Sequence, residues 1–218
     1  AIVAFYGAPL DLKDHELLAC RTAIKMQERL AVLREQWQEE GERWPEIVHH
    51  MQNRIGINTG KMVTGNMGSE SRMNYTMMGD TVNLAARLES SAKQYGVYIQ
   101  ISDTTYESIK DQVVVRALDF VRVMGKTEPV KVFELISEKD QEPEQYKKIL
   151  PVFHEGLGYY FNQDWDKAIE AFKAADELEE MFPGRKTNPS RIYIPRCENF
   201  KVNPPGDDWD GVWTQTSK

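Results

Sequence analysis

Apolar residues recur at steps of three and four along residues 14–40, which places them on one side of a helix. A similar spacing returns in residues 81–95 and stops at Gly96, a residue type that commonly ends helices. A shorter helix is expected from a cap at Ser102 to about residue 111. The apolar positions of the two long helices are Ala19, Ala23, Met26, Leu30, Leu33 and Trp37, then Leu84, Leu88 and Ala92.

Between these helices the apolar residues lie in short runs or alternate with polar residues, as they do in strands. Residues 54–58 alternate, and the Gly60-Lys61 pair predicts a turn from which residues 62–65 return as the second strand of a hairpin. Together with the helices, the strands predict a mixed α+β fold up to residue 138. The other expected strands are residues 1–6, 97–101, 113–116, 120–123 and 130–135.

The pattern changes after residue 137, and no further strand is expected. We therefore divide the chain into a mixed α+β domain at residues 1–138 and a small helical extension with a tail at residues 139–218. The expected elements of the extension are a polar linker at 138–144, helices at 146–162 and 165–180, a third helix that begins at a Ser190 cap, and an extended tail at 204–218.

Eight residues of the extension form a pattern of their own: Gly156, Leu157, Tyr160, Trp165, Ala168, Ile169, Phe172 and Ala175. Their spacing resembles one tetratricopeptide unit, a helix–turn–helix of about 34 residues. A plain helical hairpin is the equally open alternative. Because a single unit cannot bury its apolar face alone, we expect it to pack on the preceding domain, on the third helix or on a protein partner.

Composition narrows the class of protein. The net charge of −7 and a pI of about 5.3 argue against a nucleic-acid partner, which would favour a basic face. Cys20 and Cys197 form no CxxC or Cys/His cluster, which excludes a disulfide framework or structural zinc and fits a reducing compartment. No apolar run approaches the ~18 residues of a membrane span, and no signal peptide is visible. The strand-like opening leads us to expect a segment of a longer protein.

The candidate chemistry lies in residues 54–87. Glycines are frequent here, and each either allows a close approach of the backbone or serves only a tight turn. Asn83 and Arg87 are four residues apart on one predicted helix, so they share a face. An amide beside a guanidinium suits a ribose oxygen and a phosphate. The alternative is that both are ordinary solvated side chains.

Three sequence blocks provide context: RIGINTG at residues 54–60, GDTVNLAARL at 79–88 and GKTEPVKVFEL at 125–135. In order and spacing they resemble the catalytic domain of class III nucleotide cyclases, and the resemblance covers residues 1–135. It is closest to the bacterial adenylate cyclase branch. The resemblance implies a ferredoxin-like α+β fold, here without its first strands and helices. It also implies a homodimer, in which two subunits pair head to tail with the sites between them.

The resemblance also implies roles for single residues. Asn83 matches the asparagine that orients the ribose, and Arg87 the arginine that stabilises charge on the α-phosphate as the ring closes. Arg54 matches an arginine that contacts the terminal phosphates. Thr76 lies where the family reads the purine: adenylate cyclases carry Asp or Thr there, and guanylate cyclases favour Cys or a similar small residue. We therefore expect ATP as substrate. The alternative for Thr76 is a residue that merely fills a strand.

The chain departs from the family pattern in two places. A lysine that holds phosphate in many relatives is replaced by Met124, and Lys126 either substitutes for it or is a surface lysine. The family also binds two Mg²⁺ or Mn²⁺ ions through two aspartates, and both matching positions fall upstream of Ala1. No metal ligand is therefore expected within this chain. Asp80 is expected to cap its helix instead.

The implied reaction converts ATP to 3′,5′-cyclic AMP and pyrophosphate by two-metal-assisted attack of the ribose 3′-oxygen. We expect the chain as given to be inactive, with one sheet edge open. The alternative function is a non-enzymatic, degenerate cyclase module for dimerisation or protein binding. Residues 204–213 also resemble the C-terminus of bacterial cyclases with a membrane-anchored sensor upstream, which would place this domain on the cytoplasmic side.

Overall fold

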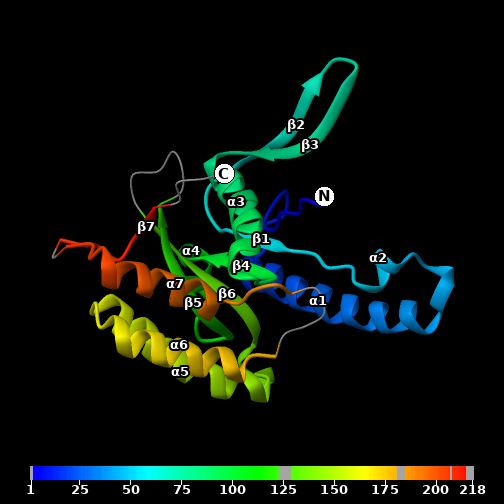
Figure 1. Ribbon diagram of the computed structural model, residues 1–218. Helices are drawn as coiled ribbons and strands as arrows, with labels where there is room; N and C mark the ends of the chain where they lie inside the picture. The colour runs from blue at the N-terminus through cyan, green and yellow to red at the C-terminus, as the bar shows by residue number, and fades with distance from the viewer. Residues whose placement is uncertain (1, 123–128, 181–184, 207, 215–218) are drawn as a thin grey trace.

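A five-stranded sheet forms the centre of the computed structural model, which describes residues 2–122, 129–180, 185–206 and 208–214 (Figure 1). The strand order is β1-β4-β6-β5-β7. The β1–β4 and β5–β7 pairs are parallel, whereas β6 is antiparallel to both of its neighbours. The strands are β1 (Ile55–Ile57), β4 (Ile99–Ser102), β6 (Val130–Glu138), β5 (Val113–Arg122) and β7 (Trp213–Thr214).

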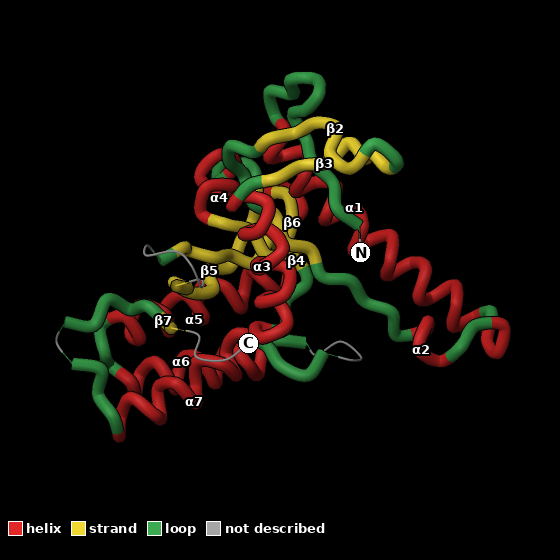
Figure 2. Tube along the Cα trace, turned by 90° about the horizontal axis from the view of Figure 1, so that it is seen from above, coloured by secondary structure: helices red, strands yellow, loops and turns green. Residues whose placement is uncertain are grey.

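Helices cover both faces of this sheet (Figures 1 and 2). α1 (His15–Glu39) and α4 (Asp103–Ile109) pack on one face, where their apolar residues meet Ile101 and Phe133 of the sheet. α3 (Asp80–Tyr95) packs on the other face through Leu84 and Leu88, which share a core with Leu118 and Val132. The sheet is therefore buried on both sides. None of the described helices is long and apolar enough to cross a membrane.

Local sequence patterns predict these helices correctly. α1 and α3 cover nearly the residues that the three-and-four spacing marks out. Gly96 ends α3 in the left-handed conformation, with φ of +65°, as a C-terminal glycine does. Ser102 caps α4, because its side chain accepts a hydrogen bond from the backbone N–H of Thr105. Asp80 is the first residue of α3 rather than its cap, a position that Gly79 takes.

The predicted hairpin of residues 54–58 with 62–65 is wrong. β1 pairs with β4, while β2 (Val63–Ser69) pairs antiparallel with β3 (Arg72–Met78) across a two-residue turn. The tight turn keeps the β2–β3 pairing local, and β1 finds its partner more than forty residues later. The β2–β3 hairpin projects away from the main sheet (Figure 1).

The strand expected at residues 1–6 is not formed by its described part, residues 2–6. A strand needs hydrogen-bond partners on a neighbouring strand, and the described part of the chain has no strand paired with this segment. Ile2 and Val3 are accordingly exposed, at 85% and 71%. Near its end, Phe5 approaches Tyr75 of the hairpin, with ring centroids 6.0 Å apart.

Three smaller expectations also need correction. The strands expected at 113–116 and 120–123 are, over the described residues, one strand, β5, which irregular pairing with β6 interrupts but does not end. The third helix of the extension is capped by Asn188 rather than Ser190, because the Asn188 side chain accepts from the N–H of Arg191. The tail, expected to have no strand, contributes the short β7.

The helical extension consists of three helices that pack on the sheet face beside α3. α5 (Glu144–Phe161) and α6 (Trp165–Leu178) form a hairpin, and α7 (Pro189–Val202) packs against them around buried aromatic residues. Gly156 allows the hairpin to close, because a Cβ there would lie 2.9 Å from the Phe172 ring. The extension thus buries its apolar face against its own third helix and the sheet, two of the three possibilities expected from the sequence.

Candidate active site

The candidate site is built around α3, which lies directly on β1. Gly56 of β1 makes this possible: a Cβ there would lie 2.2 Å from the carbonyl oxygen of Ala85 and 2.3 Å from the backbone nitrogen of Glu89. Only a residue without a side chain permits such close contact between a strand and a helix backbone. Gly56 therefore fixes the height of α3 above the sheet.

Arg54 lies next to α3 because it immediately precedes β1. Its Nε is 3.3 Å from Oε1 of Glu89, and both side chains are about 40% exposed. An exposed ion pair of this kind contributes roughly 0–1 kcal/mol to stability. The Arg54 guanidinium can therefore exchange this carboxylate for a phosphate at little cost.

Asn83 and Arg87 are both exposed on α3. Their separation of four residues places them on one face of the helix, as the sequence predicts. Asn83 lies at the end of the first turn of α3, where the helix dipole favours negative charge, and Arg87 lies one turn further along. Asp80, in the first turn, makes no side-chain capping bond. The amide and the guanidinium thus stand on an exposed face of this helix.

Asn58 is a residue beside the candidate site that the sequence interpretation did not single out. Its Nδ2 donates to the Thr81 carbonyl at 2.9 Å, and its Oδ1 accepts from the hydroxyls of Ser102, at 2.6 Å, and Thr104, at 3.1 Å. These bonds tie the end of β1 to the first turn of α3 and to the start of α4. A polar residue directly after a strand, in the block RIGINTG, was the available sign of this role.

Thr76 is partly buried in β3, opposite Gly65 of β2. The β3–α3 connection is short, since β3 ends at Met78 and α3 begins at Asp80. Thr76 therefore stands close in sequence to the start of α3, but on the projecting hairpin rather than on the sheet. Lys126 and Met124 lie outside the described residues.

Within the described ranges, the structure has no group of three or more His, Cys, Asp or Glu residues that could hold a metal ion. The carboxylates near α3 do not form the donor set that two divalent ions need. The residues present therefore do not fit the Mg²⁺ or Mn²⁺ ions of the family, and we assign no step to them.

Two hollows among the described residues lie away from these side chains. One, of about 310 Å³, lies between α5 and α6 beside Tyr159 and Lys167. The other, of about 420 Å³, lies between the sheet and the extension beside Phe120 and Phe161. Neither is lined by Arg54, Thr76 or the two α3 residues. The side chains of Arg54, Asn83 and Arg87 are themselves exposed on the surface of the domain.

The sequence of this chain matches a family model described as the adenylate and guanylate cyclase catalytic domain over residues 3–137. The match covers well over half of the chain, so the chain belongs to the nucleotide cyclase family. The class III resemblance read from the three sequence blocks is confirmed at this level, and the helical extension lies outside the matched residues. Whether the extension is a tetratricopeptide unit stays a prediction.

Named relatives agree with this assignment. The chain is 39% identical over 153 residues to "Adenylate cyclase, terminal-differentiation specific" from Dictyostelium discoideum, which covers 68% of the chain and 7% of that protein. It is 34% identical over 136 residues to "Adenylate cyclase 1" from Rhizobium meliloti, which covers 62% of the chain and 20% of that protein. The chain thus spans a small part of these relatives.

Solved structures share the mixed α+β cyclase fold. The adenylyl cyclase CyaB from P. aeruginosa matches with a TM-score of 0.53 at 33% identity, over 63% of this chain and 68% of the other. The guanylyl cyclase Cya2 matches with a TM-score of 0.51 at 34% identity, over 62% and 65% of the two chains. Because cyclases named for either nucleotide match about equally well, overall similarity does not choose between ATP and GTP.

Proposed function

We propose that the whole protein is an adenylate cyclase that converts ATP to 3′,5′-cyclic AMP and pyrophosphate. The observation that carries the proposal is the arrangement on α3: Asn83 and Arg87 share its exposed face, and Arg54 is held beside the same helix through Glu89. Three groups suited to ribose and phosphates thus lie on two elements that Gly56 brings into contact. The adenylate cyclases among the relatives support the same reaction.

In this proposal the ribose 3′-oxygen attacks the α-phosphorus. A new bond forms between the 3′-oxygen and the α-phosphorus, the bond from the α-phosphorus to the oxygen shared with the β-phosphate breaks, and pyrophosphate leaves with that electron pair while the proton of the 3′-hydroxyl passes to solvent water. The Asn83 amide orients the ribose, and the Arg54 guanidinium holds the terminal phosphates. The Arg87 guanidinium neutralises charge that grows on the α-phosphate in the transition state.

The divalent ions that the family uses are proposed to be Mg²⁺ or Mn²⁺, held by carboxylates outside the described residues. For the 218-residue chain alone we expect no turnover, because its described carboxylates form no site for two ions beside the triphosphate. Cyclic AMP above a no-enzyme blank in Mn²⁺-ATP would contradict this.

The preference for ATP rests on Thr76. Its hydroxyl can accept a hydrogen bond from the adenine amino group or donate one to a ring nitrogen. The test is to assay the whole protein with Mn²⁺-ATP and with Mn²⁺-GTP, and to compare Thr76→Cys with Thr64→Cys on the neighbouring strand β2. We expect cyclic AMP to dominate in the wild type, and the ratio of cyclic AMP to cyclic GMP to fall only in Thr76→Cys. Equal or greater cyclic GMP output from the wild type would overturn the preference.

We further propose that the domain works on the cytoplasmic side.

We also propose that two copies of the chain complete the site. The exposed binding groups leave room for a second subunit, and the projecting hairpin offers exposed apolar side chains to it. These are Val63, Met73, Tyr75 and Met78. Absence of both cyclic nucleotides in every assay would favour the alternative, a degenerate cyclase module that binds a protein.

A further inference from the structure

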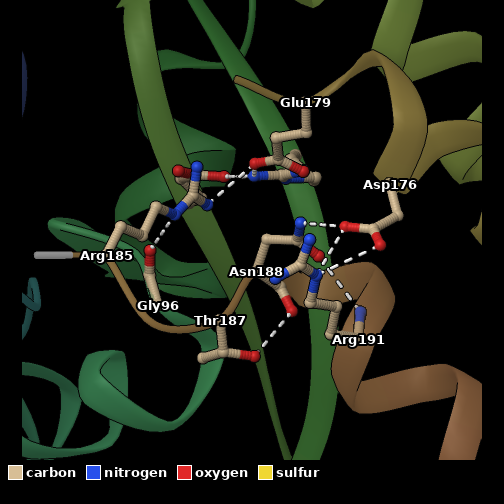
Figure 3. A network of polar contacts seen from close by, with 9 residues as sticks. Gly96, Asp176, Glu179, Arg185, Thr187, Asn188 and Arg191 are labelled. Carbon is tan, nitrogen blue, oxygen red and sulfur yellow. Dashed lines mark hydrogen bonds and ion pairs between the residues drawn. The ribbon is translucent and has the colours of Figure 1, made fainter. Parts of the chain in front are cut away.

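The helical extension reaches back to the end of α3. The segment 185–188 directly precedes α7. In it, Arg185 Nε donates to the carbonyl oxygen of Gly96 at 2.8 Å (Figure 3). The backbone of Thr187 presses on the same glycine, since a Cβ at Gly96 would lie 2.0 Å from the Thr187 carbonyl oxygen. Gly96 therefore both ends α3 and receives the extension.

The segment 185–188 is held by a buried group of alternating charges. Arg185 Nη2 is 2.7 Å from Glu179 Oε1, and the Glu179 carboxylate accepts two hydrogen bonds from Arg116 of β5, at 2.8 and 2.9 Å. Arg116 also donates from Nε to Glu134 of β6 at 2.7 Å. Two positive and two negative side chains thus compensate one another out of contact with water.

A second link joins α7 to α3 on the same side. Tyr95, the last residue of α3, donates its hydroxyl to Asp119 Oδ2 at 2.7 Å, and Arg196 of α7 donates to the same oxygen at 2.6 Å. Ile192 of α7 packs against the apolar cluster that contains Leu88. The extension therefore contacts the C-terminal half of α3 in three ways: at the backbone of Gly96, through Asp119 at the Tyr95 side chain, and in the apolar core beside Leu88.

The held end of α3 and its reactive end belong to one rigid helix. At 1.5 Å per residue, Arg87 lies about 14 Å and Asn83 about 20 Å along the axis from Gly96. A helix transmits a displacement at one end to the other, and a misplacement of about 1 Å in a reacting group can cost ~10²-fold in rate. The contacts that fix the position of Gly96 therefore also affect the positions of the Asn83 amide and the Arg87 guanidinium.

We propose that the extension is a positioning element of the catalytic site, in which Arg185 sets the placement of α3 and, through it, of Asn83 and Arg87. The proposal rests on the proposed function for its catalytic consequence. It gives the extension a role inside the chain, whether or not a protein partner also binds it.

The test compares Arg185→Ala with Arg191→Ala. Arg191 is the matched control, because it is an arginine of the same extension that pairs with Asp176 but is 45% exposed and does not reach α3 in the contacts shown (Figure 3). Arg185→Lys keeps a positive charge near Glu179 and is expected to recover part of the effect. Each variant is studied below its unfolding transition, so that only folded molecules are compared.

Two measurements are made. In this chain, hydrogen–deuterium exchange should rise along residues 88–96 of Arg185→Ala and stay at the wild-type level in Arg191→Ala. In the whole protein, kcat for ATP should fall about ten- to hundredfold in Arg185→Ala, with KM changed much less because Arg54 lies outside α3, directly before β1. A residue that only stabilises the fold would lower the urea midpoint and leave kcat unchanged.

The outcomes separate the two proposals. Unchanged exchange along α3, or unchanged kcat in Arg185→Ala when Arg87→Ala is inactive, would overturn the positioning role and leave the proposed function standing. A wild-type protein without cyclase activity would overturn the proposed function, and with it the catalytic consequence drawn here. Raised exchange together with reduced kcat supports both.

Discussion

Two surfaces of the sheet domain differ in whether their charged side chains are buried or exposed. Where the extension meets the sheet, Arg116 is fully buried, the Glu179 side chain is 2% exposed, and each has a charged partner at hydrogen-bond distance. On the proposed nucleotide face, Asn83 and Arg87 are exposed, and Arg54 shares a half-exposed ion pair. One surface is closed and electrostatically compensated, whereas the other is open.

The strongly shifted pKa values of Arg116 and Glu179 belong to the closed surface and not to the candidate site. Burial alone would lower the pKa of Arg116, but the carboxylates of Glu134 and Glu179 outweigh it and raise that pKa. Burial alone would raise the pKa of Glu179, but Arg116 and Arg185 lower it. Such shifts often mark catalytic residues. Here the shifts of Arg116 and Glu179 mark a packing interface.

The largest expected effect comes from breaking the closed surface. Glu179→Ala leaves Arg116 with the single carboxylate of Glu134 and removes the carboxylate that pairs with Arg185, and removing one partner from a buried ion pair costs about 3–5 kcal/mol. The measurement is the free energy of unfolding from urea titration. Glu180→Ala, at the exposed neighbouring position, should change it by less than about 0.5 kcal/mol. A loss below 1 kcal/mol in Glu179→Ala would show that the network is not what holds the extension.

The open surface should respond in the opposite manner. Arg87→Ala in the whole protein should lower kcat roughly 10²–10³-fold with little change in KM, because its guanidinium acts on charge that develops in the transition state. The urea midpoint should stay near that of the wild type, since Arg87 is exposed. Lys93→Ala, an exposed change on the same helix, is the control. Near-normal turnover in Arg87→Ala would make Arg87 an ordinary surface residue.

Gly56→Ala tests the contact on which the open surface is built. The added methyl would overlap the backbone of α3 at Ala85 and Glu89, and overpacking of this kind costs about 1–3 kcal/mol. Both the free energy of unfolding and kcat should fall, because α3 must lift from β1. At Gly65 an added Cβ meets no atom within 4 Å, so Gly65→Ala is the matched control. Equal effects of the two variants would contradict the role of Gly56.

The smallest effect concerns pH at the closed surface. Desolvation by neighbouring atoms and the charge of Arg116 lower the pKa of His154, an exposed residue whose Nε2 accepts from the Ala117 N–H at 3.2 Å. The His154 ring therefore takes up a proton less readily in the folded state than in the unfolded chain, where protonation sets in below about pH 6.5. Stability should decrease as the pH falls from 7.5 to 5.5, and less so in His154→Gln. The exposed His50 gives the control variant, and identical pH profiles for all three proteins would exclude this linkage.

The sequence predicts the parts of this fold that local chemistry determines. The spacing of apolar residues, Gly96 and the Ser102 cap each act within a few residues, and the helices α3 and α4 form where they indicate. The partner of β1 could not be predicted in this way, because β1 and β4 pair across more than forty intervening residues and a nearer partner was equally compatible with the pattern.

The candidate site shows the same division. The four-residue spacing of Asn83 and Arg87 places them on one helix face, but their roles, and those of Arg54 and Thr76, came from family resemblance and stay predictions. Asn58 was missed because its three partners lie on other elements. The bond between Arg116 and Glu179 joins residues 63 positions apart, and nothing in either neighbourhood indicates it.

The distance along the chain between Gly96 and Arg185 has a consequence for biosynthesis. The two residues are separated by 89 positions, so at ~5–20 residues per second the ribosome adds Arg185 roughly 4–18 s after Gly96. During that interval α3 can form, but three of its later contacts cannot. The partners of the Gly96 carbonyl, Arg116 and Asp119, which are Arg185, Glu179 and Arg196, have not yet been synthesised. The contacts that hold the helix with the proposed catalytic residues are thus complete only after residues 179–196 have been translated.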